Sequence, residues 1–216
     1  MTNAAELDEK LKAVFSAGGN TAQLAELYDA WAPAFEQDIW ASANPYIAIV
    51  AGYVGRQVRN LEACVLDAGC GTGLLGQILA HMGYRNLVGL DASRGMLEVA
   101  RTKKVYSELH QLLLDENIPL PEARFDAITA AGVLTHGHAP PASLNGLLRL
   151  AKPGAALIFS LSEVAANEGG FLDKMLSLER QNAWTSIANT APFQSFPFSQ
   201  NQSHLYNRIH VYVKTR

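Results

Sequence analysis

Two carboxylates and a glycine-rich turn are the residues of this chain best suited to bind a small molecule. Residues 66–76 read LDAGCGTGLLG, with glycine at positions 69, 71, 73 and 76. Glycine is entropically costly to order, so this density indicates that the backbone must approach another group closely. The spacing at 71–76 fits GxGxxG, in which backbone N–H groups at a helix start approach a dinucleotide phosphate. On its own that fingerprint is weak evidence.

Two acidic residues near the turn indicate which charged groups its ligand carries. Asp67 stands two residues before Gly69, inside the end of an apolar run. A carboxylate there suits a ligand that carries an ammonium and a sulfonium, and it suits a pyrophosphate poorly. Asp91 ends the second apolar run, 18 residues after Gly73. At that distance a carboxylate can hold both hydroxyls of a ribose.

A parallel sheet is the arrangement that would bring these residues to one edge. Short apolar runs without a polar face predict buried strands at 63–69, 86–93, 108–114, 124–134 and 155–162. Helices are predicted between them at 73–81, 93–103 and 143–150. This alternation predicts a doubly wound α/β fold, in which ligands bind beyond the carboxyl ends of the strands.

The two ends of the chain follow other patterns. Apolar residues recur three or four positions apart from 21 to 40, which predicts a helix bent near Pro33. A second helix is predicted to begin at Asn44 and Pro45, so two helices are expected before the first strand. Residues 169–184 are predicted to form one helix. The period-two alternation of 208–214 predicts a late antiparallel strand.

Bulk composition limits the classes of partner. The chain has 216 residues, 49% of them hydrophobic, and a formal net charge of -3. Such a chain is poorly suited to neutralise phosphates, so nucleic acid is not expected as a partner. No apolar run is long enough for a membrane span, and the start MTNAAELDEKLK lacks an apolar signal core. Cys64 and Cys70 are expected to be reduced thiols, which favours a cytoplasmic location. Nothing in the sequence predicts the oligomeric state.

Four segments follow one another in the order found in one enzyme family. They are LDAGCGTG at 66–73, VGLDAS.GML at 88–97, FDAITAAGVLTH at 125–136 and LLRLAKPGA at 147–155. Together they resemble the class I S-adenosylmethionine-dependent methyltransferase family, over roughly residues 28–161. YDAWAPAFEQDI, which begins at Tyr28, resembles the first helix of members that act on small molecules. Within the family, the chain is most similar to the Williams-Beuren-region methyltransferase-like group.

The resemblance implies a fold and an activity. The implied fold is a Rossmann-like, doubly wound α/β sheet of seven strands in the order 3-2-1-4-5-7-6, with strand 7 antiparallel. An N-terminal helical cap is expected at residues 1–60 and the methyltransferase domain at residues 61–216. The implied cofactor is S-adenosyl-L-methionine. The implied reaction transfers its methyl group to O, N or S of a small molecule by in-line displacement.

The resemblance also assigns roles to the matching positions. The glycine turn and Asp67 would face the methionine part of the cofactor, and Asp91 would hold the ribose. Adenine is expected near Asp115 and Glu116, and the N-terminal helix is expected to cover the cofactor. The full expected binding set is Tyr28, Trp31, Asp67, Gly69, Cys70, Gly71, Gly73, Asp91, Ala92, Met96, Asp115, Glu116, Ala130, Gly132 and Val133.

The histidines after the fourth predicted strand are the remaining candidates for chemistry. His136 is the candidate catalytic residue, as a base or as a substrate contact. His136 and His138 lack a visible third ligand, so no metal site is predicted. Two other functions stay open. An NAD(P)-linked oxidoreductase would need a catalytic pair such as Tyr and Lys, which the sequence does not show. A cofactor-binding regulator without chemistry would differ only in forming no product.

Overall fold

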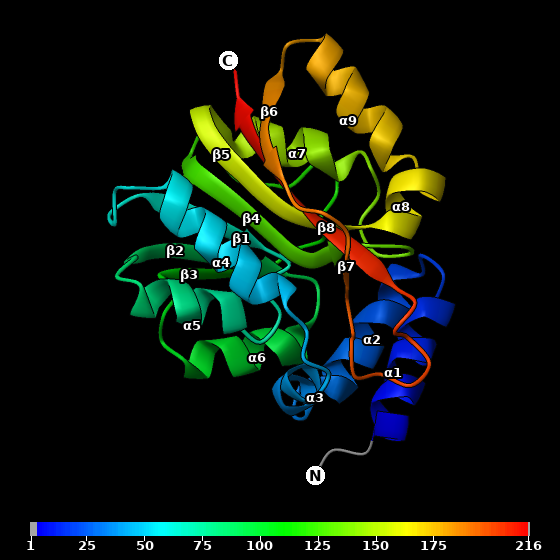
Figure 1. The fold of residues 1–216 in the computed structure, drawn as a ribbon. Coiled ribbons are helices and arrows are strands. Elements are labelled where there is room, and N and C mark those ends of the chain that lie inside the picture. The colour runs from blue at the N-terminus through cyan, green and yellow to red at the C-terminus, as the bar shows by residue number, and fades with distance from the viewer. Residues whose placement is uncertain (1–3, 216) are drawn as a thin grey trace.

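A single mixed sheet forms the centre of the molecule in the computed structural model, which describes residues 4–215 (Figure 1). In the described residues the sheet has eight strands in the order β3-β2-β1-β4-β5-β8-β6, and β7 pairs with β8. Neighbours from β3 to β5 are parallel, whereas β8 is antiparallel to β5 and β6. The bounds are β1 Cys64–Ala68, β2 Asn86–Asp91, β3 Glu108–Gln111, β4 Phe125–Leu134, β5 Ala151–Ser162, β6 Trp184–Asn189, β7 Phe193–Gln194 and β8 Tyr206–Lys214.

The predicted Rossmann-like topology is confirmed. The antiparallel strand lies between the fifth and sixth strands, and the two-residue strand β7 is the reason that it is numbered β8. The predicted alternation at 208–214 lies within β8, where alternate residues such as Ile209 and Val211 are fully buried. Figure 1 shows β8 crossing the molecule between β5 and β6.

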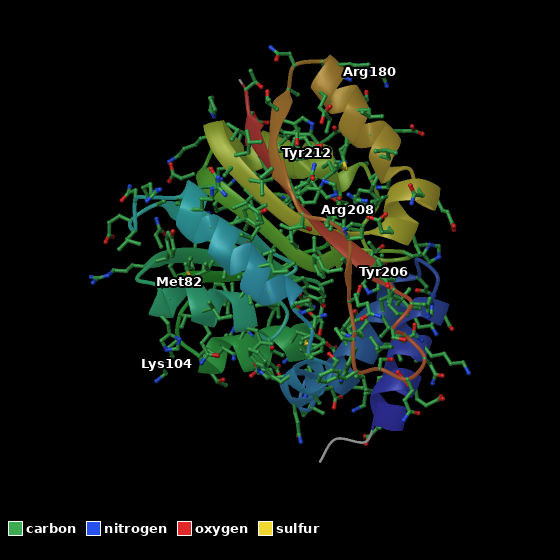
Figure 2. All side chains as sticks on the ribbon, viewed as in Figure 1. Met82, Lys104, Arg180, Tyr206, Arg208 and Tyr212 are labelled. Carbon is green, nitrogen blue, oxygen red and sulfur yellow. The ribbon has the colours of Figure 1, made fainter. Side chains whose placement is uncertain are left out.

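Helices cover both faces of the sheet. On one face α4 (Tyr46–Gln57) packs against β4, β5 and β8, and α5 (Leu74–His81) packs against α4 and β2. On the other face α7 (Ser143–Leu150), α8 (Glu163–Glu168) and α9 (Phe171–Arg180) share a core with β4 and β5. That core includes a stack of Phe159, Trp184 and Tyr212, the last of which is labelled in Figure 2.

Four helices precede β1 in the described residues, where two were expected. They are α1 (Ala4–Ser16), α2 (Thr21–Trp31), α3 (Phe35–Ala41) and α4. The helix predicted at 21–40 is divided at residues 32–34, because Pro33 lacks a backbone N–H and its ring opposes the preceding turn. The first three helices share a separate apolar cluster that also includes Leu74 and Phe196. The proposed division at residue 60 stays a prediction, and α4 packs on the sheet while α1–α3 lie beyond its edge (Figure 1).

Two other predicted elements have different bounds. The helix predicted at 169–184 covers only α9, because Gly170 adopts a left-handed φ of 78° at its start and Asn182 one of 54° after its end. Trp184 therefore begins β6 instead of ending a helix. The fifth strand begins at Ala151 instead of 155, with a register shift opposite Phe125 and Ala127 that accommodates Pro153 and Gly154.

Candidate functional site

The glycine turn joins β1 to α5, at the carboxyl edge of the parallel strands. Gly69, Gly71 and Gly73 all have positive φ, at 73°, 53° and 85°. A Cβ at Gly69 would overlap Val133, and one at Gly73 would press on Tyr106. A Cβ at Gly71 would meet nothing within 4 Å. Gly71 is therefore the glycine of this turn that faces open space, and the others make room for side chains of the protein.

Asp67 is a buried carboxylate held by neutral donors. Its side chain is 2% exposed. The Tyr106 hydroxyl donates to Oδ2 at 2.7 Å, and the Thr129 hydroxyl donates to Oδ1 at 3.1 Å. None of the ion pairs among the described residues includes Asp67. Burial raises the pKa of Asp67 to about 6, against the effect of the two hydrogen bonds. Such a group favours a cationic ligand, because the protein supplies no counter-charge.

Asp91 orders the turn as well as lining the space beside it. One carboxylate oxygen accepts from the Gly71 N–H at 2.8 Å, and the other accepts from the Ser93 N–H at 2.9 Å. Burial raises the pKa of Asp91, while these backbone N–H groups act in the opposite direction. Each carboxylate oxygen keeps a further lone pair, so Asp91 can also accept hydrogen bonds from a ligand.

The turn opens into a cavity of about 670 Å³, within the range typical of small-molecule sites. It extends from the carboxyl edge of the sheet to α1 and α2 and to the segment before β8. The expected residues that line it are Tyr28, Trp31, Asp67, Gly69, Cys70, Gly71, Asp91, Ala92, Met96, Asp115, Gly132, Val133 and His136.

Three expected residues are not part of the cavity lining. Gly73 is turned toward Tyr106. Glu116 is exposed, and its carboxylate accepts from the Asn145 amide at 2.6 Å. Ala130 is buried in the core below α7, because alternate residues of a strand point to opposite faces. Its neighbour Ala131 lines the cavity instead.

Aromatic rings from α2 and α3 cover the cavity. Tyr28 and Trp31 stack with ring centroids 5.9 Å apart, and the Phe35 ring meets Trp31 edge to face at 5.0 Å. The Trp31 indole N–H donates to the buried carboxylate of Asp38 at 2.7 Å, which fixes the ring. Trp31 is therefore a packed residue that also lines the cavity, and Tyr28 is half-buried beside it.

The two histidines have different surroundings. His136 lines the cavity but its side chain is exposed. His138 Nδ1 lies 3.0 Å from the His136 carbonyl oxygen, and Nε2 lies 2.8 Å from the Tyr28 hydroxyl. A carbonyl only accepts, so the neutral ring carries its proton on Nδ1 and Nε2 accepts from Tyr28. Burial lowers the pKa of His138, which keeps the ring neutral. The sequence did not indicate that His138, and not His136, is the histidine held by hydrogen bonds at both ring nitrogens.

Helix α2 is fixed to the start of α6 (Arg94–Thr102). Oδ1 of Asp29 accepts from the Gly95 N–H at 2.8 Å and from the Ser93 hydroxyl. A Cβ at Gly95 would overlap the backbone of Asp29, so glycine is needed for this approach. The Ser93 hydroxyl also caps α6 by accepting from the Met96 N–H. Asp29 was not among the expected site residues, although it follows Tyr28 directly.

Thr72 is a further cavity residue that the sequence did not single out. Its side chain is 1% exposed, it lines the cavity, and its hydroxyl has no hydrogen-bond partner among the described residues. A buried hydroxyl without a partner is unusual, and this one is free to hydrogen-bond with a water or a ligand group in the cavity. In the described part of the chain, no cluster of three or more His, Cys, Asp or Glu side chains could hold a metal ion.

Comparison with known proteins identifies the class of this fold and site. Residues 66–159 match the family model of a methyltransferase domain. Human methyltransferase-like protein 27 is 33% identical over 149 residues, which are 68% of this chain and 60% of the relative. A ubiquinone biosynthesis O-methyltransferase of Alkalilimnicola ehrlichii is 36% identical over 50% of this chain and 45% of the relative. The chain thus spans less than two thirds of the length of these relatives.

Solved structures show the same fold. The [4+2]-cyclase SpnF superposes with a TM-score of 0.69 at 15% identity, covering 90% of this chain and 97% of the cyclase. Magnesium protoporphyrin IX methyltransferase of Synechocystis PCC 6803, solved with bound S-adenosylmethionine, has a TM-score of 0.62 at 21% identity and 83% coverage of both chains. At this identity the likeness shows the fold alone, and one of the two proteins is named as a cyclase.

The fold and the motif-bearing turn define a cofactor-binding α/β protein of the methyltransferase type. The chain belongs to the class I S-adenosylmethionine-dependent methyltransferase family, and S-adenosylmethionine is its cofactor. The predicted similarity to the Williams-Beuren-region group is confirmed, since methyltransferase-like protein 27 is the member from that region.

Proposed function

We propose that this protein transfers a methyl group from S-adenosylmethionine to a hydroxyl oxygen of a small, neutral, largely apolar molecule. The observation that carries the proposal is the continuous cavity from the glycine turn to an apolar chamber under α1 and α2. Two curated relatives are named as O-methyltransferases, one of ubiquinone biosynthesis and one, from Serratia marcescens, of malonyl-[acyl-carrier protein]. Those names support oxygen over nitrogen or sulfur as the acceptor atom.

Three features of the turn fit the cofactor. Asp67 lacks a cationic partner in the described protein and suits the ammonium group. The open face of Gly71 and the unpartnered Thr72 hydroxyl leave a place for a polar ligand beside it. Asp91 would hold the ribose hydroxyls, and Asp115 lies farther along the same lining. The remaining cofactor contacts are proposed for Ala92, Met96, Gly132 and Val133.

The acceptor chamber lies beyond the proposed cofactor residues and is mostly apolar. The acidic residues of the cavity are Asp67, Asp91 and Asp115, all in segments assigned to the cofactor, and Lys12 is the only lysine or arginine of the described residues that lines it. A carboxylated or phosphorylated acceptor would lack a set of cationic partners there. The apolar chamber wall consists of Leu11, Val14, Phe15, Leu24, Phe35, Ile39, Phe196 and Leu205.

A hydroxyl acceptor must lose its proton, and Tyr28 with His138 can receive it. The cofactor, when bound, supplies a methyl group already activated on a sulfonium. The acceptor hydroxyl would donate to the Tyr28 oxygen, while Tyr28 gives its own proton to Nε2 of His138. Tyr28 stays neutral throughout this relay. A positioned base adds roughly 10²–10⁴-fold to the rate, and exclusion of water by α1–α3 supports the alignment of the reactants.

The test compares the two histidines as variants in a methyl-transfer assay. Neutral phenols and alcohols, together with carboxylates and amines of similar size, are incubated with S-adenosylmethionine, and products are detected by mass. We expect His138→Gln to lower turnover at least about 100-fold without weakening S-adenosylhomocysteine binding, whereas His136→Ala has little effect. Activity of the unmodified protein should fall as the pH drops through the pKa of His138, which lies below 6.5.

Two results would overturn parts of this proposal. Methylation confined to carboxylates or amines would contradict the neutral hydroxyl acceptor. A His136→Ala variant that loses turnover, beside an active His138→Gln variant, would return the catalytic role to His136.

We also propose that the protein is located in the cytoplasm. Both cysteines are free thiols, Cys70 buried in the turn and Cys64 half-buried, which suits that reducing compartment.

A further inference from the structure

Tyr106 reaches Asp67 from the opposite side of the cavity wall. It lies between α6 and β3 and is not part of the cavity lining. A Cβ on Gly73, Gly76 or Gly89 would overlap or press on its ring. Gly73 of the turn, Gly76 of α5 and Gly89 of β2 thus form the hollow that the ring fills. The hydroxyl at the end of the ring donates to Asp67.

We propose that Tyr106 is a positioning residue for the cofactor: its hydroxyl holds the Asp67 carboxylate oriented and ionised toward the cavity, where that carboxylate binds the ligand ammonium. This inference rests on the proposed role of Asp67 and adds a residue that does not touch the ligand. It also explains part of the glycine motif, because Gly73 and Gly76 make room for Tyr106 and not for the ligand.

The ionised state of Asp67 depends on the hydrogen bond from Tyr106, because the other groups that face the carboxylate are neutral or negatively charged. Asp91 on the neighbouring strand is a like charge, and the Cys70 thiol stays neutral because burial raises its pKa well above the usual value. Thr129 on β4 and Tyr106 are neutral donors, and the pKa of Tyr106 is also raised well above its usual value by burial. Among the described residues no cation offsets the burial of Asp67, so loss of the Tyr106 hydroxyl should raise the pKa of Asp67 further.

Filling the hollow and holding the carboxylate are separable roles. Tyr106→Phe keeps the ring in the hollow and removes only the donor. Tyr84→Phe is the matched control, because Tyr84 is also a buried tyrosine, 3% exposed, whose hydroxyl donates to the Val58 carbonyl at 2.6 Å away from the cavity. A general loss of stability would affect both variants in the same way.

The experiment measures S-adenosylhomocysteine binding by calorimetry from pH 5.5 to pH 8.5. In the unmodified protein, affinity should fall as the pH drops through about 6, the pKa of Asp67. In Tyr106→Phe the midpoint should rise by about one pH unit, so that binding is about fivefold weaker at pH 6 and within about twofold at pH 8.5. Tyr84→Phe should follow the unmodified protein. Protonation of Asp91 contributes to the pH dependence of binding in all three proteins, so its contribution cancels when they are compared.

Asp67→Asn shows whether the effect passes through this carboxylate. In that background the added Tyr106→Phe change should no longer move the midpoint. If Tyr106→Phe does not fold, Thr129→Val removes the other donor and should raise the midpoint in the same direction. An unchanged midpoint in a folded Tyr106→Phe variant overturns this inference and leaves the methyltransferase proposal intact. Absence of binding by the unmodified protein at every pH contradicts the proposed function itself.

Discussion

At the scale of single residues, Asp67 combines burial with a charge that the protein does not neutralise. Its pKa in the folded protein, about 6, lies above the usual value of 3.8. The folded state therefore holds a proton more tightly than the unfolded state. This contribution to stability is present below the unfolded pKa and is lost as the pH rises through the folded pKa.

Asp67→Asn should consequently be more stable than the unmodified protein at pH 8, by about 1–3 kcal/mol in the free energy of unfolding. The difference should be small near pH 4 and should grow until about pH 6. Urea denaturation at several pH values measures it. Asp126→Asn is the control of opposite sign, because the Lys152 ammonium beside Asp126 helps to lower its pKa. An Asp67→Asn protein less stable at pH 8 would contradict this account.

Asp91 gives a second prediction at this scale. If it accepts hydrogen bonds from both ribose hydroxyls, Asp91→Ala removes two charge-assisted bonds worth roughly 1.5–3 kcal/mol each. S-adenosylhomocysteine affinity should fall at least about tenfold while the protein stays folded. Asp126→Ala also removes an acceptor of a backbone N–H, that of Cys64, but lies outside the cavity lining. Equal affinities of the Asp91→Ala and unmodified proteins would place the ribose elsewhere.

Sequence motifs predicted residues at the carboxyl edge of the sheet better than residues of the opposite wall. Asp67 and Asp91 are fixed by the ends of β1 and β2, so their approach to the cavity follows from the motif. Glu116 follows Asp115 directly, yet the loop turns it toward Asn145, which no spacing rule indicates. Tyr106 and His138 hydrogen-bond to partners distant in sequence, so only the folded chain reveals these contacts.

At the scale of elements, α2 is the helix whose role most needs a test. It carries Tyr28 and Trp31 into the cavity wall, while Asp29 fixes it to the start of α6. Tyr28 also hydrogen-bonds to His138, but the apolar residues of α2 pack in the small cluster of α1–α3, so the helix can loosen without exposing the sheet core. The structure is therefore consistent with a cover that tightens over bound ligand.

Hydrogen exchange distinguishes a cover from a permanently packed helix. S-adenosylhomocysteine should slow exchange of amides near Tyr28 and Trp31 more than exchange in β8 from Ile209 to Val213. Strand β8 is the internal control, since it pairs with β5 on one side and β6 on the other. Deletion of residues 1–40 should leave a folded domain with weak binding and no turnover. Unchanged protection near Tyr28, together with an unfolded deletion protein, would contradict the cover.

Elements with a regular pattern were predictable and irregular junctions were not. The buried strands β1, β2 and β4 follow from continuous apolar runs. The helix predicted to begin at residue 169 begins at Phe171, directly after the left-handed Gly170, but the six-residue helix α8 before it was not predicted. Most residues of β6 are exposed, and its pairing with β8 is a long-range contact that local pattern does not encode.

At the scale of the whole molecule, segments from the two ends of the chain close the cavity over the carboxyl edge of the sheet. Its outer wall joins α1 and α2 to the segment before β8, and the Asn201 amide donates to Asp8 at 2.9 Å between them. Figure 1 shows this late segment beside α1. Both regions of this wall lie outside residues 66–159, which match the methyltransferase domain. In the described residues no helix is long and apolar enough to cross a membrane.

The glycine turn should bind S-adenosylmethionine and its demethylated product, and it should not bind a dinucleotide. Calorimetric titration of the unmodified protein with S-adenosylhomocysteine and, separately, with NAD tests it directly. Because Asp67 is an unneutralised carboxylate beside the open face of Gly71, we expect binding of S-adenosylhomocysteine and no heat of binding for NAD. Tight binding of NAD, with no response to S-adenosylhomocysteine, would contradict the account.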